Sequence, residues 1–216
     1  MRSPRRVRCV LLLAGWLLIA AGLFGTPPAA ARAEPAATRL SIIDGSEARF
    51  RARELFLGKL LTSEAVGRTS EIGGSLVLLA DGSFASDQSG ITVDLRTLTS
   101  DQALRDDYIK SNTLRVSAYP TVQFVPTSAL GLPPVLPASG PLRFQIVGDL
   151  TVRDKTRSTV WDVDAELTED LVTGTANTTV TFDQFGLVKP VIEDIASIED
   201  ELKLELDFRA SRETAQ

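Results

Sequence analysis

The chain has 216 residues, 23 of them basic and 28 acidic, with a formal net charge of −5, one cysteine and no histidine. Without histidine, Ser-His-Asp and Cys-His nucleophiles cannot be assembled, and metal or haem sites that use imidazole are excluded. The acidic balance argues against a nucleic-acid partner, because affinity for phosphate backbones rests on lysine and arginine.

The first 33 residues have the pattern of an export signal. A basic head with Arg2, Arg5, Arg6 and Arg8, an apolar run over residues 10–24 and the small-residue site Ala31-Arg32-Ala33 follow one another. The apolar run is shorter than the roughly 20 residues that span a membrane, so cleavage after Ala33 is favoured over an uncleaved anchor. We expect an exported protein, periplasmic or extracellular, that keeps 18 basic and all 28 acidic residues, a formal charge of −10, and loses Cys9 with the signal peptide.

The remaining chain divides into a leader, one domain and a tail. Residues 34–39 are rich in Ala and Pro without periodicity, and predict a short flexible leader. A chain of this length can bury roughly 70% of its unfolded surface in one core. One domain is therefore predicted over residues 40–210, followed by a tail over residues 211–216.

Period-two alternation of apolar and polar residues recurs along the domain and predicts β-strands. It is clearest over residues 142–152, and it returns over residues 161–167, 176–182 and 202–208. Shorter candidates lie at residues 48–53, 60–66, 71–79, 90–95 and 121–125. Half of each long strand is apolar and half is polar, as in a sheet with one buried face.

Amphipathic strands joined by short turns indicate an antiparallel sheet, because parallel strands are covered on both faces and are apolar throughout. Closing the sheet into a barrel removes its exposed edges, so an all-β barrel is favoured over the alternative, a two-sheet sandwich. One helix is predicted within residues 99–118, with Ser100 and Asp101 as candidate caps. Residues 126–141, with five prolines, predict an irregular crossover that either rims a cavity or is a surface insertion.

Several blocks of residues, in chain order, resemble the YceI-like family. Residues 105–111 (RDDYIKS) followed by 119–124 (YPTVQF) are similar to the "RD..l.s…yP…F" signature of that family. Residues 148–161 are similar to its "G.LTirGvT" block, residues 182–186 (FDQFG) to its "dFGi" segment, and residues 202–208 to its closing strand. The similarity spans the chain from about Leu40 to Arg209.

The resemblance implies an eight-stranded antiparallel lipocalin-like barrel with one short helix near its mouth, whose cavity holds a polyisoprenoid or a similar amphiphilic lipid. The chain departs from the family pattern at Asp154, where glycine is usual, and at Leu114, where phenylalanine is usual. Ser46-Glu47-Ala48 also stands where many members carry a His-Ser pair. These departures leave the identity of the lipid open.

The candidate ligand-binding residues are apolar side chains on the inward strand faces and polar side chains on or after the helix. The apolar set is Phe50, Phe124, Phe144, Ile146, Leu150, Trp161, Val163, Val180, Phe182, Leu204 and Leu206. Tyr108, Tyr119 and Arg105 are candidates to hold a head group at the mouth; for Arg105 the alternative is a solvated helix face. An interior filled by its own side chains is the alternative to a cavity, because a barrel of about eight strands is wide enough for either.

The predicted function is the binding of an isoprenoid or other long apolar lipid, for transport or storage, by an exported protein that is not an enzyme. Asp162, Asp164 and Glu166 share one strand face, but this face lies opposite the apolar one and is expected to be solvated, so no catalytic acid/base pair is indicated. We expect no cofactor, no metal and no nucleic acid, and the sequence is compatible with a monomer or a homodimer. The alternative function is a structural or interaction module with a filled barrel.

Overall fold

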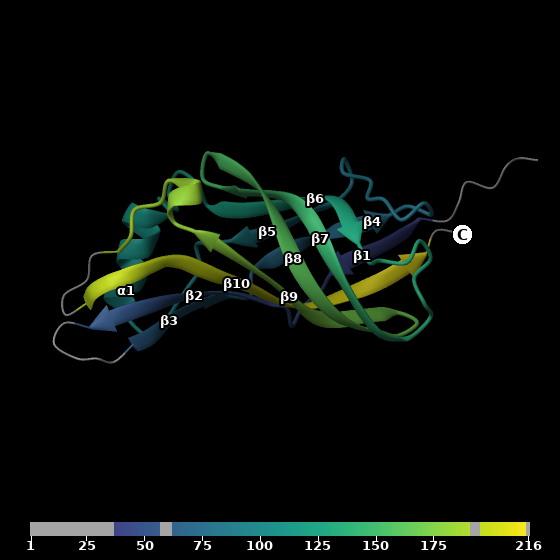
Figure 1. Cartoon of the computed structure of the whole chain (residues 1–216), viewed down its shortest axis with the longest axis horizontal. Coiled ribbons are helices and arrows are strands. Elements are labelled where there is room, and N and C mark those ends of the chain that lie inside the picture. Colours follow the sequence, from purple (N-terminus) through teal and green to yellow (C-terminus); the bar gives the residue numbers. More distant parts are fainter. Residues whose placement is uncertain (1–36, 57–61, 191–194, 215–216) are drawn as a thin grey trace, which may run out of the picture. The chain divides into compact units, whose positions relative to one another are not determined.

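The computed structural model of the chain describes residues 37–56, 62–190 and 195–214; the predicted signal peptide lies outside them. The strands are β1 (Thr38–Ile42), β2 (Glu47–Phe56), β3 (Thr62–Thr69), β4 (Ile72–Leu78), β5 (Gly90–Asp94), β6 (Thr121–Leu130), β7 (Gly140–Val152), β8 (Lys155–Leu167), β9 (Leu171–Thr181) and β10 (Ile195–Thr214). Short helical segments join them: α1 (Ala103–Tyr108), the π-helix η1 (Ile109–Thr113) and the 3-10 helix η2 (Asp183–Phe185). Figure 1 shows the strands wrapped around a common axis, with α1 at one end.

The strands form one antiparallel sheet that closes through β10. The C-terminal half of β10 pairs with β1, and its N-terminal half pairs with β2, where Leu204 lies opposite Phe50. β1 and β2 therefore occupy a single strand position in the wall of the barrel. β3, which pairs with β2, and β4, which pairs with β1, together occupy the next position. The result is a closed eight-stranded antiparallel barrel with one short helix, which confirms the predicted fold class.

A turn at Asp44-Gly45 separates β1 from β2. Gly45 has a φ of 90°, which residues with a Cβ rarely adopt. The buried hydroxyl of Ser46 then bridges the break: it donates to the carbonyl of Ile43 at 2.9 Å and accepts from the backbone N–H of Arg209 at 3.0 Å. The interruption of the wall strand therefore leaves no backbone donor unpaired at Arg209.

The inner face of the barrel is apolar along its length. One cluster of buried side chains includes Ile146, Val163 and Leu167, and a second includes Leu150 and Phe185. The rings of Phe124 and Trp161 pack against both clusters and meet edge to face, with their centroids 5.7 Å apart. The alternation seen in the sequence therefore places two stretches of core inside the barrel, joined by an aromatic pair.

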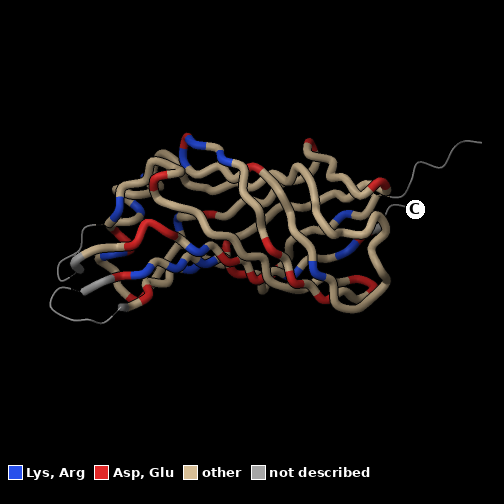
Figure 2. The backbone as a smooth tube through the Cα atoms, viewed as in Figure 1, with Lys and Arg blue, Asp and Glu red and all other residues tan. Residues whose placement is uncertain are grey.

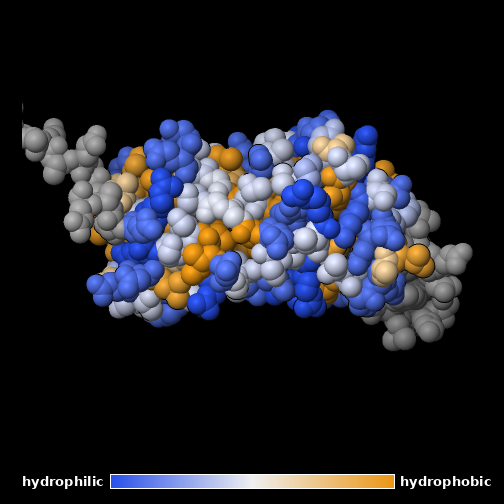
Figure 3. Space-filling view, turned by 180° about the vertical axis from the view of Figure 1, so that it is seen from behind, coloured by the Kyte–Doolittle hydropathy of each residue, from blue (hydrophilic) through white to orange (hydrophobic). Residues whose placement is uncertain are grey.

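The outer face carries the charges. Figure 2 shows acidic and basic residues distributed along the strands, and Figure 3 shows a face on which hydrophilic residues surround smaller apolar patches. An ion-pair cluster joins β2 to β10: Glu205 accepts hydrogen bonds from Arg51 at 2.9 Å, from Arg49 at 3.2 Å and forms an ion pair with Lys203 at 2.7 Å. Burial alone would raise the pKa of Glu205, but the hydrogen bonds from Lys203, Arg51 and Arg49 outweigh it and lower the pKa to about 2.

The helix lies inside the predicted range, but the predicted caps do not act as caps. α1 begins after Gln102, which makes no side-chain capping bond. Ser100 and Asp101 instead contact the guanidinium of Arg105, and the backbone N–H of Ser100 donates to Asp106 at 2.9 Å. The two polar residues are used to position a buried arginine, which competes with capping.

The predicted crossover over residues 126–141 is shorter than expected. β6 continues through Pro126 to Leu130, and β7 begins at Gly140, so only residues 131–139 lie between the strands. Pro126 is tolerated because the β6–β7 register shifts between Pro126 and Ser128, and proline within a sheet is found at such bulges. β1 also begins at Thr38 and β10 ends at Thr214, so strand residues lie beyond both predicted limits of the domain, 40 and 210.

The ladder between β8 and β9 ends early. β7 and β8 pair along their whole lengths, down to the turn at Arg153-Asp154. β8 and β9, by contrast, pair only between Leu167↔Val172 and Asp162↔Asn177. Beyond this point the two strands diverge, and a polar groove of about 500 Å³ lies between them, lined by Ser158, Thr179 and Gln184 among others.

Candidate ligand cavity

The barrel encloses an apolar cavity with a volume of about 260 Å³. Its wall contains every predicted ligand-binding residue except two: Phe50, Arg105, Phe124, Phe144, Ile146, Leu150, Trp161, Val163, Val180, Phe182, Leu204 and Leu206. Several of the largest of them, including Phe50, Phe144 and Trp161, are only partly buried although they lie inside the barrel. The interior is therefore not completely filled by its own side chains.

Other residues of the wall were not singled out from the sequence. They include Leu40 from β1, Leu76 from β4, Ile91 from β5 and Phe208 from β10. The strands β1, β4 and β5 are short, and a short strand gives a weak alternation signal. Phe208 shared the inward parity of Leu204 and Leu206, so its position could have been predicted from the same pattern.

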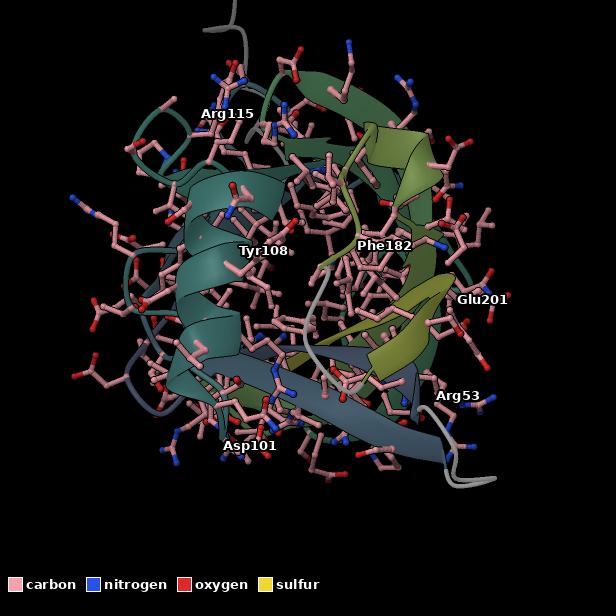
Figure 4. The ribbon with its side chains drawn as sticks, turned by 90° about the vertical axis from the view of Figure 1, so that its left-hand side faces the viewer. Arg53, Asp101, Tyr108, Arg115, Phe182 and Glu201 are labelled. Carbon is pink, nitrogen blue, oxygen red and sulfur yellow. The ribbon has the colours of Figure 1, made fainter. Side chains whose placement is uncertain are left out.

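Tyr108 and Tyr119 do not contribute to the cavity wall. Two guanidinium groups lie near the ring of Tyr119, with that of Arg115 5.9 Å and that of Arg153 5.7 Å from the ring centroid. From the helical segment it is instead Arg105, Ile109 and Thr113 that reach the wall. Figure 4 looks at this end of the barrel, with Tyr108 on the helix and Phe182 across the opening.

Glu54 and Arg105 form a buried ion pair in the wall of this otherwise apolar cavity. Arg105 Nη1 lies 3.4 Å from Glu54 Oε1, and both side chains are 3% exposed. Glu54 follows Ala48, Phe50 and Ala52 at the inward positions of β2. The sequence reasoning missed Glu54, although continuing the alternation of β2 by one more inward position would have found it.

The guanidinium of Arg105 is held in place from α1 and the segment before it. Its Nε and Nη2 lie 3.2 Å and 3.0 Å from Ser100 Oγ, and Nη2 also contacts Asp101. Burial raises the pKa of Glu54, and the charge of Arg105 opposes that shift only in part. The cavity wall thus has a polar position at Glu54 and Arg105, with a fixed cation beside a carboxyl group that is costly to ionise.

Within the described residues, no group of three or more acidic, cysteine or histidine side chains could hold a metal ion. In the same part of the chain, no helix is both long and apolar enough to cross a membrane.

The closed antiparallel barrel, its apolar lumen and the helix at one end define a lipocalin-like β-barrel. The model of the YceI-like domain matches residues 40–210. The chain therefore belongs to the YceI-like family, which confirms the resemblance seen in the sequence. Comparison with curated proteins gave no match.

Similar solved structures share the fold at low sequence identity. A polyisoprenoid-binding domain from Saccharophagus degradans, implicated in plant cell wall breakdown, has a TM-score of 0.61 and 9% identity, over 80% of this chain and 97% of that one. BcnA from Burkholderia cenocepacia has a TM-score of 0.57 and 15% identity, over 76% and 95% of the two chains. A YceI protein from Campylobacter jejuni has a TM-score of 0.54 and 13% identity, over 73% and 90%.

Proposed function

We propose that the protein binds one long apolar lipid, an isoprenoid or a similar amphiphile, inside the barrel. The observation that carries the proposal is the apolar cavity of about 260 Å³, whose wall is formed by side chains of both core clusters. This volume lies just below the usual range of about 300–1,000 Å³ for ligand pockets, which favours a slender chain over a bulky ring system. The similarity in fold to a polyisoprenoid-binding domain supports the same class of ligand.

Burial of the lipid chain supplies the driving force. Each CH₂ group removed from water contributes about 0.8 kcal/mol, so a chain of many carbons needs few directional contacts to bind. Selectivity then depends on the width and length of the cavity. A hydrogen-bonding group at the end of a lipid can meet the guanidinium of Arg105 beside Glu54 in the cavity wall.

The rival function is a structural module with a filled barrel. Native cores leave few voids larger than a water molecule, so a cavity of about 260 Å³ favours the binding protein. We also propose that the protein carries or stores its lipid without transforming it. The cavity wall contains two carboxyl–guanidinium pairs, Glu54–Arg105 and Glu205–Arg49, and otherwise mainly apolar side chains.

Extraction of the purified protein with organic solvent, followed by mass spectrometry, tests the proposal. We expect an isoprenoid or other long-chain lipid in a ratio to protein that approaches one. Protein purified in detergent-free buffer from a host rich in isoprenoid lipids is the appropriate sample. Protein that is empty after this treatment, and that does not take up polyprenols when they are added, would exclude the carrier function.

We further propose that the protein acts outside the cytoplasm, after removal of residues 1–33. The basic head, apolar run and Ala31-Arg32-Ala33 site support this proposal. N-terminal sequencing of the protein recovered from its own cell fractions tests it. A new N-terminus at Glu34 in the exported fraction is expected, and an intact Met1 in the cytoplasmic fraction would contradict it.

A further inference from the structure

Three glycines on the inner face of the barrel each lie beneath a phenylalanine ring. Gly67 of β3 is directly opposite Phe50 of β2, and Gly174 of β9 is directly opposite Phe208 of β10. Gly148 of β7 lies at the inward parity of Ile146 and Leu150, next to Phe124 of β6. All three rings belong to the cavity wall.

The rings occupy the space that a side chain would need. A Cβ atom on Gly67 would lie 2.7 Å from Phe50 Cζ, one on Gly148 2.6 Å from Phe124 Cε2, and one on Gly174 3.0 Å from Phe208 Cζ. Contacts of 3.0 Å and below are far shorter than the 3.5–4.0 Å optimum between carbon atoms. None of the three glycines has a positive φ, so a left-handed backbone conformation is not the reason for glycine at these positions.

We infer that Gly67, Gly148 and Gly174 set the bore of the cavity, and therefore which lipids fit, by letting the three rings lie flat against the wall. The inference rests on the proposed function. A ring displaced from a glycine inside a closed barrel can move only toward the lumen, because the strand occupies the other side. Each glycine thus contributes space to the ligand although it offers no side chain for contact.

Gly67 gives the cleanest test. The nearest atoms to its added Cβ all belong to the Phe50 ring, which can rotate, whereas a Cβ on Gly148 would also meet the carbonyl oxygen of Val125 at 2.6 Å. A Cβ on Gly174 would likewise overlap the carbonyl oxygen of Asp164. Gly73 of β4 is the matched control, because it is also a strand glycine without positive φ but has no atom within 4 Å of the added Cβ.

The experiment compares the full-length protein with the Gly67→Ala, Gly73→Ala and Gly67→Ala/Phe50→Ala variants. Crystals under xenon pressure report the open lumen, because xenon enters dry apolar cavities whatever their natural ligand. Titration with all-trans-geranylgeraniol reports lipid binding. For Gly67→Ala we expect loss of xenon beside Phe50 and about tenfold weaker prenol binding, the loss that corresponds to about two methylene groups left unburied.

The controls separate the possible failures. Gly73→Ala should behave as the unmodified protein, and removal of the ring in Gly67→Ala/Phe50→Ala should restore xenon binding in this part of the lumen. Unchanged xenon sites and prenol affinity in Gly67→Ala would overturn the inference. If Gly67→Ala does not fold, the double variant must fold and bind xenon; its failure to fold would overturn the inference as well. Xenon uptake without any prenol binding by the unmodified protein would refute the proposed function alone.

Discussion

Glu54 and Arg105 meet in the wall of the apolar cavity, one from a strand of the barrel and the other from the helix at its end. Removing one member of a buried ion pair typically costs about 3–5 kcal/mol, because the other charge is left without compensation. We expect Arg105→Leu to lower the free energy of unfolding by about 3 kcal/mol at pH 7. Urea unfolding measures it, and a loss below about 0.5 kcal/mol would contradict a structural role for the pair.

The double variant Glu54→Leu/Arg105→Leu should be far less destabilised than Arg105→Leu alone. Replacing both buried charges with apolar side chains is often neutral or stabilising, and a double-mutant cycle isolates the coupling between the two. If the double variant loses as much as the sum of the single variants, the two side chains do not act as a pair.

The raised pKa of Glu54 predicts that its contribution to stability decreases as the pH rises. Because burial raises its pKa in the folded protein, the folded state holds this proton more tightly than the unfolded state does. The contribution of Glu54 to stability is therefore present below pH 4.5 and is lost as the pH rises through the raised pKa. Relative to Glu54→Gln, the unmodified protein should lose stability as the pH rises above about 4.5, as measured by urea unfolding at a series of pH values. A gain in stability of the unmodified protein relative to Glu54→Gln as the pH rises would contradict the raised pKa.

For Glu205 we predict the opposite dependence on pH, a contribution to stability that decreases as the pH falls. Its pKa is lowered to about 2 in the folded protein, so its contribution is present above pH 4.5 and is lost as the pH falls toward 2. We expect Glu205→Gln to lower the free energy of unfolding by about 2 kcal/mol at pH 7. The exposed Glu166, on the outer face of β8, is the control, and its replacement by Gln should change stability by less than about 0.5 kcal/mol. Equal effects of the two substitutions would show that the cluster around Glu205 does not stabilise the barrel.

The short β8–β9 ladder predicts unequal amide exchange along β8. Val152 and Lys155 flank the hairpin turn and form a hydrogen-bonded pair, so by alternation Thr159 and Trp161 bond to β7, while Ser158 and Val160 point toward β9. The β8–β9 register stops at Asp162, which leaves the latter two without a partner strand. Residue-resolved hydrogen exchange should show fast exchange at Ser158 and Val160 and slow exchange at Thr159 and Trp161. Equal protection of all four amides would mean that the ladder continues in solution.

The long strands could be predicted from the sequence, because alternation is a local signal. Leu142, Phe144 and Ile146 of β7 reach the cavity through the same parity that marks them as apolar. The positions of Tyr119 and Glu54 depend on tertiary contacts instead. The ring of Tyr119 lies near two arginines from separate segments, and Glu54 is buried only because the helix brings a cation to it.

Pro126 and Ser100 also differ from the sequence prediction because of contacts that the local sequence pattern does not specify. Pro126 lies within β6 because a bulge absorbs it, and the composition of a proline-rich segment does not specify where a bulge falls. Ser100 was a reasonable cap by residue type, but its hydroxyl is engaged by Arg105. At Pro126 the partner is the neighbouring strand β7, and at Ser100 it is Arg105 in the first turn of α1.

Thr38 lies opposite Thr214, so the first residue of β1 and the last of β10 leave the barrel side by side, at the end away from α1 (Figure 1). A tag, a linker or a solid support joined to either residue would attach the protein at the end of the barrel away from α1. The end of the barrel that carries α1 would then face away from the support.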